Sequence, residues 1–385
     1  MQTIHWLGAG LSTVPGIRRL TAGALPLVLW NRTVAKAEQA VAGLAQPATI
    51  KEFGLDILSD TVRPKDIVVS MLPGDWHTVV AELCLDKNAH FISSSYISPP
   101  MQALHPAALD KNLCLVNEVG LDPGIDHLMA HALVHDYQAS DQYDPTNSIA
   151  FRSYCGGFPS IPNDFRYKFS WSPLGVLKAL KSPSRSIRDG ETVDVTRPWH
   201  AISAYRARLP RAREETFEAY PNRDALPFMH QYGFDPAWSV DEFVRGTLRL
   251  NGWSAAWSDL FAEIEALEGE TGEQRLRQMS DELWQTQAYD EGEPDRVVLC
   301  VELEARQDGT AVWHQGYSMD ALGNEHGSAM ARLVSLTVSL AVETVAAGRV
   351  QPGVSAAPGD YTIVNEWFDA LRRLGEEIEH IDHLT

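Results

Sequence analysis

The chain has 385 residues, of which 44% are hydrophobic and 22% charged, and its formal net charge is −19. This length predicts two or three domains with buried cores, and the composition is typical of a globular protein. The negative charge excludes nucleic acid and anionic membrane surfaces as expected partners, because binding phosphates needs clustered Lys and Arg. No apolar run approaches the ~20 residues of a membrane span, so we expect no membrane partner.

The cysteines are few and far apart. They are Cys84, Cys114, Cys155 and Cys300, and no two of them have CxxC spacing. This argues against a disulfide framework or a zinc site and fits a reducing cytosol. The opening segment MQTIHWLGAGLS does not resemble a signal peptide. We therefore expect a cytoplasmic protein.

The first ~125 residues alternate short β-like runs with amphipathic helical patterns. The expected strands are 3–7, 25–30, 66–72, 90–94 and 113–117, and helical segments such as 33–44 and 76–87 lie between them. This alternation predicts βαβ units and an α/β fold with a parallel, doubly wound sheet.

The pattern changes after residue 150. Strand-like runs such as 148–154 mix with aromatic loops, and 237–290 contain helix-like segments. Residues 296–305 and 309–319 resemble a β-hairpin with RQDG as its turn. Residues 328–348 are typical of a long apolar helix, and 361–381 of an amphipathic one.

The segment GAGLSTVP (8–15) follows the first strand and opens a helix. A dinucleotide fold needs Gly8 for the tight turn and Gly10 so that the backbone can approach a pyrophosphate. The third position of the pattern usually takes a small residue and is Thr13 here. We interpret the segment as a dinucleotide-binding turn, with the contacts Gly8, Ala9, Gly10, Leu11 and Ser12.

The segment after the second strand bears on which nicotinamide cofactor binds. NAD-binding chains usually carry an acidic residue near this position, whereas this chain has Asn31, Arg32 and Thr33. Arginine can form a bidentate pair with a 2′-phosphate, which a carboxylate would repel. We therefore predict NADP(H) as the cofactor; the alternative is that Arg32 is an ordinary surface residue.

Two further loops follow expected strands, and ligands of doubly wound sheets lie beyond the carboxyl ends of the strands. In SMLPGDWH (70–77), Leu72 and Pro73 are expected to border the cofactor. In SSSYISPP (93–100), Ser94, Ser95 and Tyr96 come where the nicotinamide ring should lie.

The segment NEVGLDPGIDH (117–127) ends the last of these strands. Leu121 and Asp122 precede its turn and are expected to face the cofactor cleft. Asp126 lies in the first turn of the next helix, where a carboxylate is more often structural, and we interpret His127 in the same way.

Two further patterns concern a thiol and a possible metal site. In SYCGGFPS (153–160), Cys155 is either a buried inert thiol or part of the site. His127, His131 and His135 share a helical face, but the third is too far along the helix for a compact metal site. No metal is therefore predicted.

Together these segments resemble the saccharopine dehydrogenase family, and most closely its glutamate-forming saccharopine reductase branch. They follow the family's order over about residues 1–260. The matching segments are GAGLSTVP, NRT, SMLP, SSYISPPM, NEVGLDPGIDH, SYCGGFPS, YKFSWSPLGVLKAL, YPNRD and RGTLRLNGW. Each is weak alone, but LDPGIDH together with YCGG and KFSWSP is a specific combination.

The resemblance implies a fold of two domains and usually a homodimer. Residues 1–124 would form the Rossmann domain, completed by 350–385. Residues 125–349 would form a second α/β domain with a mixed sheet, which closes over the cofactor and carries a helical insertion at about 205–290.

The resemblance also implies a reaction, namely hydride transfer between NADP(H) and the CH–NH bond of saccharopine in lysine metabolism. The bond joins glutamate to a six-carbon aldehyde, 2-aminoadipate 6-semialdehyde. The residues carried over as catalytic groups are Tyr96, Asp122 and Cys155. Trp171 would lie near the cofactor, and Ser95, Arg223, Thr247 and Arg249 would contact the amino-acid substrate, with Arg223 on a carboxylate.

Two alternatives stay open at this point. One is a related imine reductase of polyamine synthesis, similar to carboxynorspermidine synthase, whose cationic substrate would favour carboxylates over Arg223 and Arg249. The other is a non-catalytic NADP-binding regulator, which would have no need of the polar cluster. The departures from the family pattern are Thr13, an altered SIPNDFR (160–166) and an unaligned acidic stretch at 256–325. They put the exact substrate in doubt.

Overall fold

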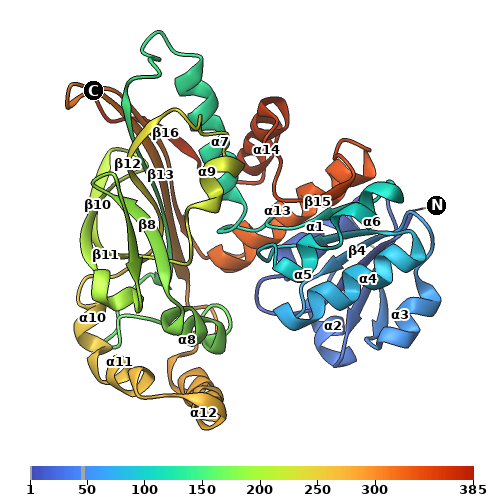
Figure 1. Ribbon diagram of the computed structural model, residues 1–385. Coiled ribbons are helices and arrows are strands. Elements are labelled where there is room, and N and C mark those ends of the chain that lie inside the picture. The colour runs from blue at the N-terminus through green and yellow to red at the C-terminus, as the bar shows by residue number, and fades with distance from the viewer. Residues whose placement is uncertain (1, 45–47) are drawn as a thin grey trace. The chain divides into compact units, whose positions relative to one another are not determined.

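The computed structural model describes residues 2–44 and 48–385, and they divide into two compact units, each with its own sheet (Figure 1). Unit 1 runs to Leu128 and also contains Glu325–Gly327 and Ala331–Leu374. Unit 2 contains Met129–Asn324, Ser328–Met330 and Gly375–Thr385.

Unit 1 contains a seven-stranded, all-parallel sheet of Rossmann type, as the sequence predicted. Its strand order is β15-β6-β5-β4-β1-β2-β3. The strands are β1 (Ile4–Leu7), β2 (Leu27–Asn31), β3 (Thr49–Glu52), β4 (Ile67–Ser70), β5 (His90–Ser93), β6 (Cys114–Val116) and β15 (Gly353–Ser355). Most central strands are buried along nearly their whole length, which explains their continuous apolar runs. Two strands were not predicted from the sequence, namely β3, whose side chains are at most partly buried, and β15.

The helices of unit 1 pack against this sheet and form a core with side chains such as Leu7, Trp30, Phe91 and Leu115, all fully buried. They are α1 (Val14–Thr21), α2 (Val34–Ala40), α3 (Leu55–Thr61), α4 (His77–Lys87), α5 (Pro99–Gln102), α6 (His105–Asp110), α13 (Ala329–Ala346) and α14 (Tyr361–Arg373). The helix α7 (Ile125–Gln138) begins in unit 1.

The helix α13 lies mostly in unit 1, whereas the predicted boundary placed residues up to 349 in the second domain. It packs closely on α1: the Gly16 N–H donates to Ser335 Oγ at 2.8 Å, and a Cβ on Gly16 would come within 2.3 Å of the Ser335 carbonyl oxygen. Gly16 thus supplies a small residue for close helix packing, three positions after Thr13.

Among the described residues, α13 is the one helix long and apolar enough to cross a membrane by length and composition. No membrane span was expected here from the sequence. Of this stretch, 78% is buried inside the protein, which is the usual situation of a core helix.

Unit 2 contains a mixed sheet, also as predicted. Its main order is β10-β11-β12-β7-β13-β14-β16, with β8 paired to β12 and β9 paired to β8. The strands are β7 (Ser148–Pro159), β8 (Ser184–Arg188), β9 (Glu191–Val195), β10 (Ser203–Leu209), β11 (Arg213–Pro221), β12 (Ser239–Arg249), β13 (Asp295–Gln307), β14 (Thr310–Leu322) and β16 (Glu379–Asp382). β7 and β12 run parallel, and the other pairs are antiparallel. The predicted hairpin is β13–β14, and its turn residues Asp308 and Gly309 both have left-handed φ angles.

The helical insertion predicted at about 205–290 is wrong in its first half. Residues 203–249 form mostly strands, with the short helix α9 (Pro227–Gln231), and the helices α10 (Trp253–Ala256), α11 (Ser258–Glu265) and α12 (Gly269–Gln287) begin only at Trp253. In β10 and β11 buried apolar residues alternate with charged ones, and this period of two belongs to a strand. Unit 2 also contains α8 (Pro173–Lys181) and most of α7.

The end of the chain also differs from the prediction. The helix α14 stops at Arg373, and β16 then pairs with β14 of unit 2. The contribution of the C-terminal region to the Rossmann unit therefore consists of β15 and α14, while Gly375–Thr385 belong to unit 2.

Candidate functional site

The glycine-rich turn after β1 has the features that a pyrophosphate needs. Gly8 has a φ of +103°, and a Cβ there would come within 2.9 Å of the Met71 carbonyl oxygen, so the turn requires glycine. A Cβ on Gly10 would meet nothing within 4 Å, so the backbone there borders open space beside the start of α1. The Thr13 hydroxyl donates to the Gly10 carbonyl at 2.8 Å and closes the turn, which explains why threonine is tolerated. The first turn of α1 holds no acidic residue, so the turn fits a bound phosphate.

The end of β2 is joined to this turn. Asn31 Oδ1 accepts a hydrogen bond from the Ala9 N–H at 3.2 Å, and Asn31 Nδ2 donates to the Thr33 carbonyl at 2.8 Å. Arg32 is exposed, and within the described part of the chain its guanidinium forms no ion pair. This arrangement leaves a cation available at the position where a 2′-phosphate is expected. Of the other predicted contacts, Leu11 and Thr33 are exposed and Ser12 is half-buried.

A buried histidine, to which the sequence analysis gave no role, connects the ends of two strands. His77 Nδ1 lies 2.9 Å from Ser70 Oγ at the end of β4, and His77 Nε2 lies 2.8 Å from Ser95 Oγ after β5. Burial lowers the pKa of His77 to about 4, so the ring is neutral at pH 7. It orients Ser95, a predicted substrate contact. The other strand-end contacts predicted here, Leu72 and Ser94, are half-buried, and Pro73 is exposed.

Glu118, also missed from the sequence, anchors the loop after β5 to the turn after β6. Its carboxylate accepts from the Ile97 N–H at 2.9 Å and lies 3.0 Å from His127 Nε2. Asp126 Oδ1 accepts from the Gly124 N–H at 2.6 Å, so Asp126 and His127 both hold the turn. Glu118 has a φ of +57°, and no sequence signal distinguished it from an exposed acid.

This framework brings together two of the three predicted catalytic residues. Tyr96 comes from the loop after β5 and Asp122 from the turn after β6, where Leu121 beside it is buried. The Tyr96 hydroxyl donates to Asp122 Oδ1 at 3.2 Å, and both side chains are half-buried. A phenol next to a carboxylate can hold and pass a proton.

The third predicted catalytic residue, Cys155, lies in unit 2. It is a buried residue on β7, and its Cα partner on the neighbouring strand β12 is Thr247. On the other side of β12, Thr247 pairs with Tyr220 of β11. The sheet therefore places two predicted substrate contacts, Cys155 and Thr247, on adjacent strands.

Arg249, at the end of β12, is a buried cation in an aromatic environment. Arg249 is only 6% exposed. Its guanidinium carbon lies 4.9, 5.5 and 5.2 Å from the ring centroids of Tyr167, Tyr220 and Trp253. Arg249 donates to the Leu248 carbonyl at 3.1 Å, but its Nε has no hydrogen-bond partner among the described residues.

No carboxylate within the described ranges forms an ion pair with Arg249. Its cross-strand neighbour Glu218 uses both carboxylate oxygens elsewhere, for the N–H groups of Gly252 at 2.8 Å and Ser254 at 2.7 Å. Arg249 is thus a buried positive charge that lacks a negative partner.

The two remaining predicted contacts are more exposed. Trp171 precedes α8 and is 37% exposed, and a Cβ on Gly175 would come within 2.5 Å of its ring, so glycine makes room for the indole. Arg223 lies in the exposed turn after β11 with a φ of +60°.

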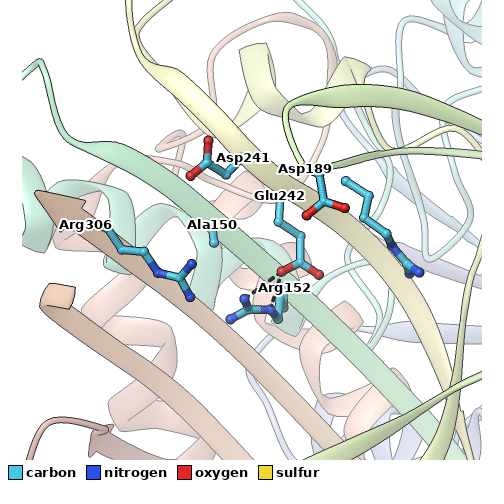
Figure 2. A pocket seen from close by; sticks show the side chains of 7 residues that line it. Ala150, Arg152, Asp189, Asp241, Glu242 and Arg306 are labelled. Carbon is cyan, nitrogen blue, oxygen red and sulfur yellow. Dashed lines mark hydrogen bonds and ion pairs between the residues drawn. The ribbon is translucent and has the colours of Figure 1, made fainter. Parts of the chain in front are cut away.

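Unit 2 also has a half-open hollow of about 180 Å³, shown in Figure 2. Arg152 in this hollow is paired with Glu242 at 2.6 Å. The lining residues are Ala150, Arg152, Arg188, Asp189, Asp241, Glu242 and Arg306. None of the predicted substrate contacts lines it, so it is distinct from the candidate site.

Family models match both parts of the chain. Residues 4–116 match the saccharopine dehydrogenase NADP binding domain, and residues 120–376 match the saccharopine dehydrogenase C-terminal domain. The chain belongs to the saccharopine dehydrogenase family. The predicted family is therefore confirmed, and the first part of the chain matches its NADP binding domain.

The chain is similar to several named relatives of this family. It is 35% identical over 260 residues to saccharopine dehydrogenase [NADP(+), L-glutamate-forming] of Pyricularia oryzae, covering 66% of this chain and 55% of that protein. The protein of the same name from Saccharomyces cerevisiae is 33% identical over 265 residues, covering 64% and 54%. The alpha-aminoadipic semialdehyde synthase of Arabidopsis thaliana is 34% identical over 232 residues, covering 58% and 21%. The chain spans about half the length of the first two relatives.

Two solved structures show the same fold. The apo saccharopine dehydrogenase (L-Glu forming) from Saccharomyces cerevisiae matches with a TM-score of 0.78 and 23% identity, covering 99% of both chains. The homospermidine synthase of Legionella pneumophila in complex with NAD matches with a TM-score of 0.67 and 9% identity, covering 99% of this chain and 91% of that one. At these identities the likeness concerns the fold alone.

Proposed function

We propose that the chain is an NADP(H)-dependent oxidoreductase that acts on the CH–NH bond of saccharopine. The reaction would be saccharopine, NADP⁺ and water to or from glutamate, 2-aminoadipate 6-semialdehyde and NADPH. The names of two relatives support this activity. Each of these relatives is about twice as long as the part of it that matches this chain. The observation that carries the proposal is the buried, unneutralised charge of Arg249.

A buried guanidinium without a counter-ion is costly, because burial removes the water that would solvate its charge. The three aromatic rings around Arg249 offset part of this cost through cation–π attraction. A substrate carboxylate would supply the missing negative charge and could form two parallel hydrogen bonds. Saccharopine carries three carboxylates, so it suits such a cation.

The residues of unit 1 suit the cofactor and the proton transfer. Gly8, Gly10 and the start of α1 would hold the pyrophosphate, and Arg32 the 2′-phosphate. When bound, the nicotinamide supplies hydride exchange with the carbon beside the secondary nitrogen. Asp122 would accept a proton, and the hydrogen bond from the Tyr96 hydroxyl to its Oδ1 supports this role.

The polyamine alternative is less well supported because its substrate is cationic. A buried positive charge such as Arg249 repels a polyamine, and neutralising it would require an additional anion. The likeness to homospermidine synthase does not favour this alternative, since it concerns the fold alone.

A non-catalytic NADP-binding regulator is also less well supported. Such a protein has no need of the hydrogen bond between Tyr96 and Asp122, or of a buried cation in its second unit. The expected homodimer and the cytoplasmic location stay predictions.

A spectrophotometric assay tests the proposal. We expect NADPH formation at 340 nm when the purified chain is mixed with saccharopine and NADP⁺, and much slower turnover with NAD⁺. Carboxynorspermidine is the matched comparison substrate. Turnover of carboxynorspermidine alone, or no turnover of saccharopine with either cofactor, would contradict the proposal.

A further inference from the structure

Three side chains on adjacent strands of unit 2 meet on one face of the sheet, outside the candidate site. Glu302 lies on β13, His314 on β14 and His383 directly after β16. His314 Nε2 lies 3.0 Å from Glu302 Oε2, and His383 Nε2 lies 3.6 Å from the same oxygen. One ligand atom from each of the three residues lies within 4.8 Å of the others.

The strand pairing fixes the two imidazoles next to each other. The His383 N–H donates to the His314 carbonyl at 2.9 Å, and the two rings stack with centroids 4.2 Å apart and an interplanar angle of 13°. Within the described part of the chain, the ring nitrogens of His383 form no hydrogen bond, because 3.6 Å is too long for one. The ring of His383 therefore faces the shared oxygen without bonding to it.

The carboxylate of Glu302 is held from its other side. The Tyr205 hydroxyl donates to Glu302 Oε1 at 3.3 Å, and a guanidinium nitrogen of Arg152 lies 3.5 Å from the same atom. These contacts orient the carboxylate and leave Oε2 directed at the two histidines. Contacts of this kind, behind a ligand atom, are common in metal sites.

A glycine leaves room at the centre of the cluster. A Cβ on Gly316, the β14 residue opposite Glu302, would come within 3.0 Å of His383 Nε2. Any other residue at this position would crowd the atom that faces the shared oxygen.

We propose that Glu302, His314 and His383 form a binding site for a divalent transition-metal ion of the Zn²⁺ class, with a further position open to water. Two imidazole nitrogens and one carboxylate oxygen are ligands that such ions prefer, whereas Ca²⁺ and Mg²⁺ prefer oxygen ligands alone. Small side-chain rotations would bring the ligand atoms from within 4.8 Å of each other to the ~3.4 Å that bonds of about 2.1 Å require.

The charges around the cluster permit a bound cation. Arg152 is the positive neighbour of Glu302. It also lies 2.6 Å from Glu242 and 3.4 Å from Glu304, so these two carboxylates still pair with Arg152 when Glu302 binds the ion. The ion would fasten the segment after β16 to the β13–β14 hairpin. No metal was predicted from the sequence, where only the histidines of 127–135 were considered. Glu302 and His383 are far apart in the chain, and only the pairing of three strands brings them together.

Metal titration of the untagged 385-residue chain tests this site. After treatment with a chelator, we expect one Co²⁺ or Zn²⁺ to bind per chain by calorimetry, and bound Co²⁺ to show visible absorption bands. His314→Ala and His383→Ala should each weaken binding at least tenfold, and Gly316→Ala should also weaken it by crowding His383 Nε2. Zn²⁺ should raise the melting temperature of the parent chain more than that of His383→Ala.

His326→Ala is the matched control, because its imidazole is exposed and lies outside the cluster. It should bind the metal as tightly as the parent chain. Circular dichroism shows whether each variant is folded. If Gly316→Ala does not fold, the metal affinity of the His383→Ala variant tests the proposal instead. The absence of saturable one-to-one binding, or equal affinity in the His383→Ala and His326→Ala variants, would overturn the proposal. Neither result depends on saccharopine turnover.

Discussion

The polar groups at the strand ends of unit 1 differ from Arg249 of unit 2 in whether they have partners. In unit 1, Ser70, His77 and Ser95 satisfy one another, and Glu118 and His127 anchor the neighbouring loops. In unit 2, Arg249 is buried among aromatic rings without a negative partner. Polar groups that hydrogen-bond to each other stabilise the folded state. A buried charge without a negative partner costs stability until a ligand of opposite charge binds to it. Substitutions in unit 1's network should therefore affect stability, and substitution of Arg249 should affect binding.

The largest effect is expected at Arg249. Arg249→Met keeps most of the side-chain volume and removes the charge, so kcat/KM for saccharopine should fall roughly 1,000-fold, about 4 kcal/mol. The free energy of unfolding should stay the same or rise, because a buried unpaired charge has been removed. Steady-state kinetics and urea denaturation measure the two quantities. A variant that is strongly destabilised but keeps a normal kcat/KM would show that Arg249 serves folding and not substrate binding.

Asp122 should show a smaller effect, on turnover rather than on folding. Asp122→Asn keeps the shape and removes the proton acceptor, so kcat should fall about 100-fold or more. The dissociation constant for NADPH, measured by fluorescence titration, should change little. Tyr96→Phe is the matched variant and should lower kcat less. Unchanged kcat in Asp122→Asn would assign the proton transfer to another group.

Arg32 of unit 1 forms no ion pair within the described part of the chain, and because it is exposed its loss should not affect folding. Arg32→Ala should weaken NADPH binding roughly 30-fold, about 2 kcal/mol, because a charge-assisted contact to the 2′-phosphate is lost. NADH binding should change little. Lys36→Ala, one helical turn further on, is the control. Equal losses for both cofactors would show that Arg32 does not recognise the 2′-phosphate.

The smallest effect concerns His77 and the pH dependence of stability. Since burial lowers its folded-state pKa from 6.5 to about 4, the unfolded chain binds a proton more readily between these values. The stabilising contribution is complete above pH 6.5 and is lost as the pH falls toward 4, amounting to about 1 kcal/mol between pH 7.5 and 5.5. Urea denaturation at both pH values measures it. His77→Gln should reduce the pH-dependent difference by that amount, and an undiminished difference would contradict the assignment.

The sequence predicted unit 1 well because its signals are local. The buried apolar runs of β1, β2 and β4 and the glycines of the first turn lie within short segments. The residues that hold the strand ends, such as His77 and Glu118, were missed because their partners are distant in the chain.

Unit 2 was harder to predict. The β10–β11 hairpin was taken for part of a helical insertion because its charged residues hid the alternation of buried positions. Arg249 was identified through the family resemblance, but its burial and its missing counter-ion depend on which side chains surround it in the folded sheet. Such properties arise only from the tertiary structure.

A crystal structure with NADP⁺ and saccharopine bound would test the central claim most directly. The account predicts a substrate carboxylate oxygen within hydrogen-bond distance, about 3 Å, of the Arg249 guanidinium. A complex in which Arg249 contacts only the aromatic rings and water, with all three substrate carboxylates bound elsewhere, would contradict it.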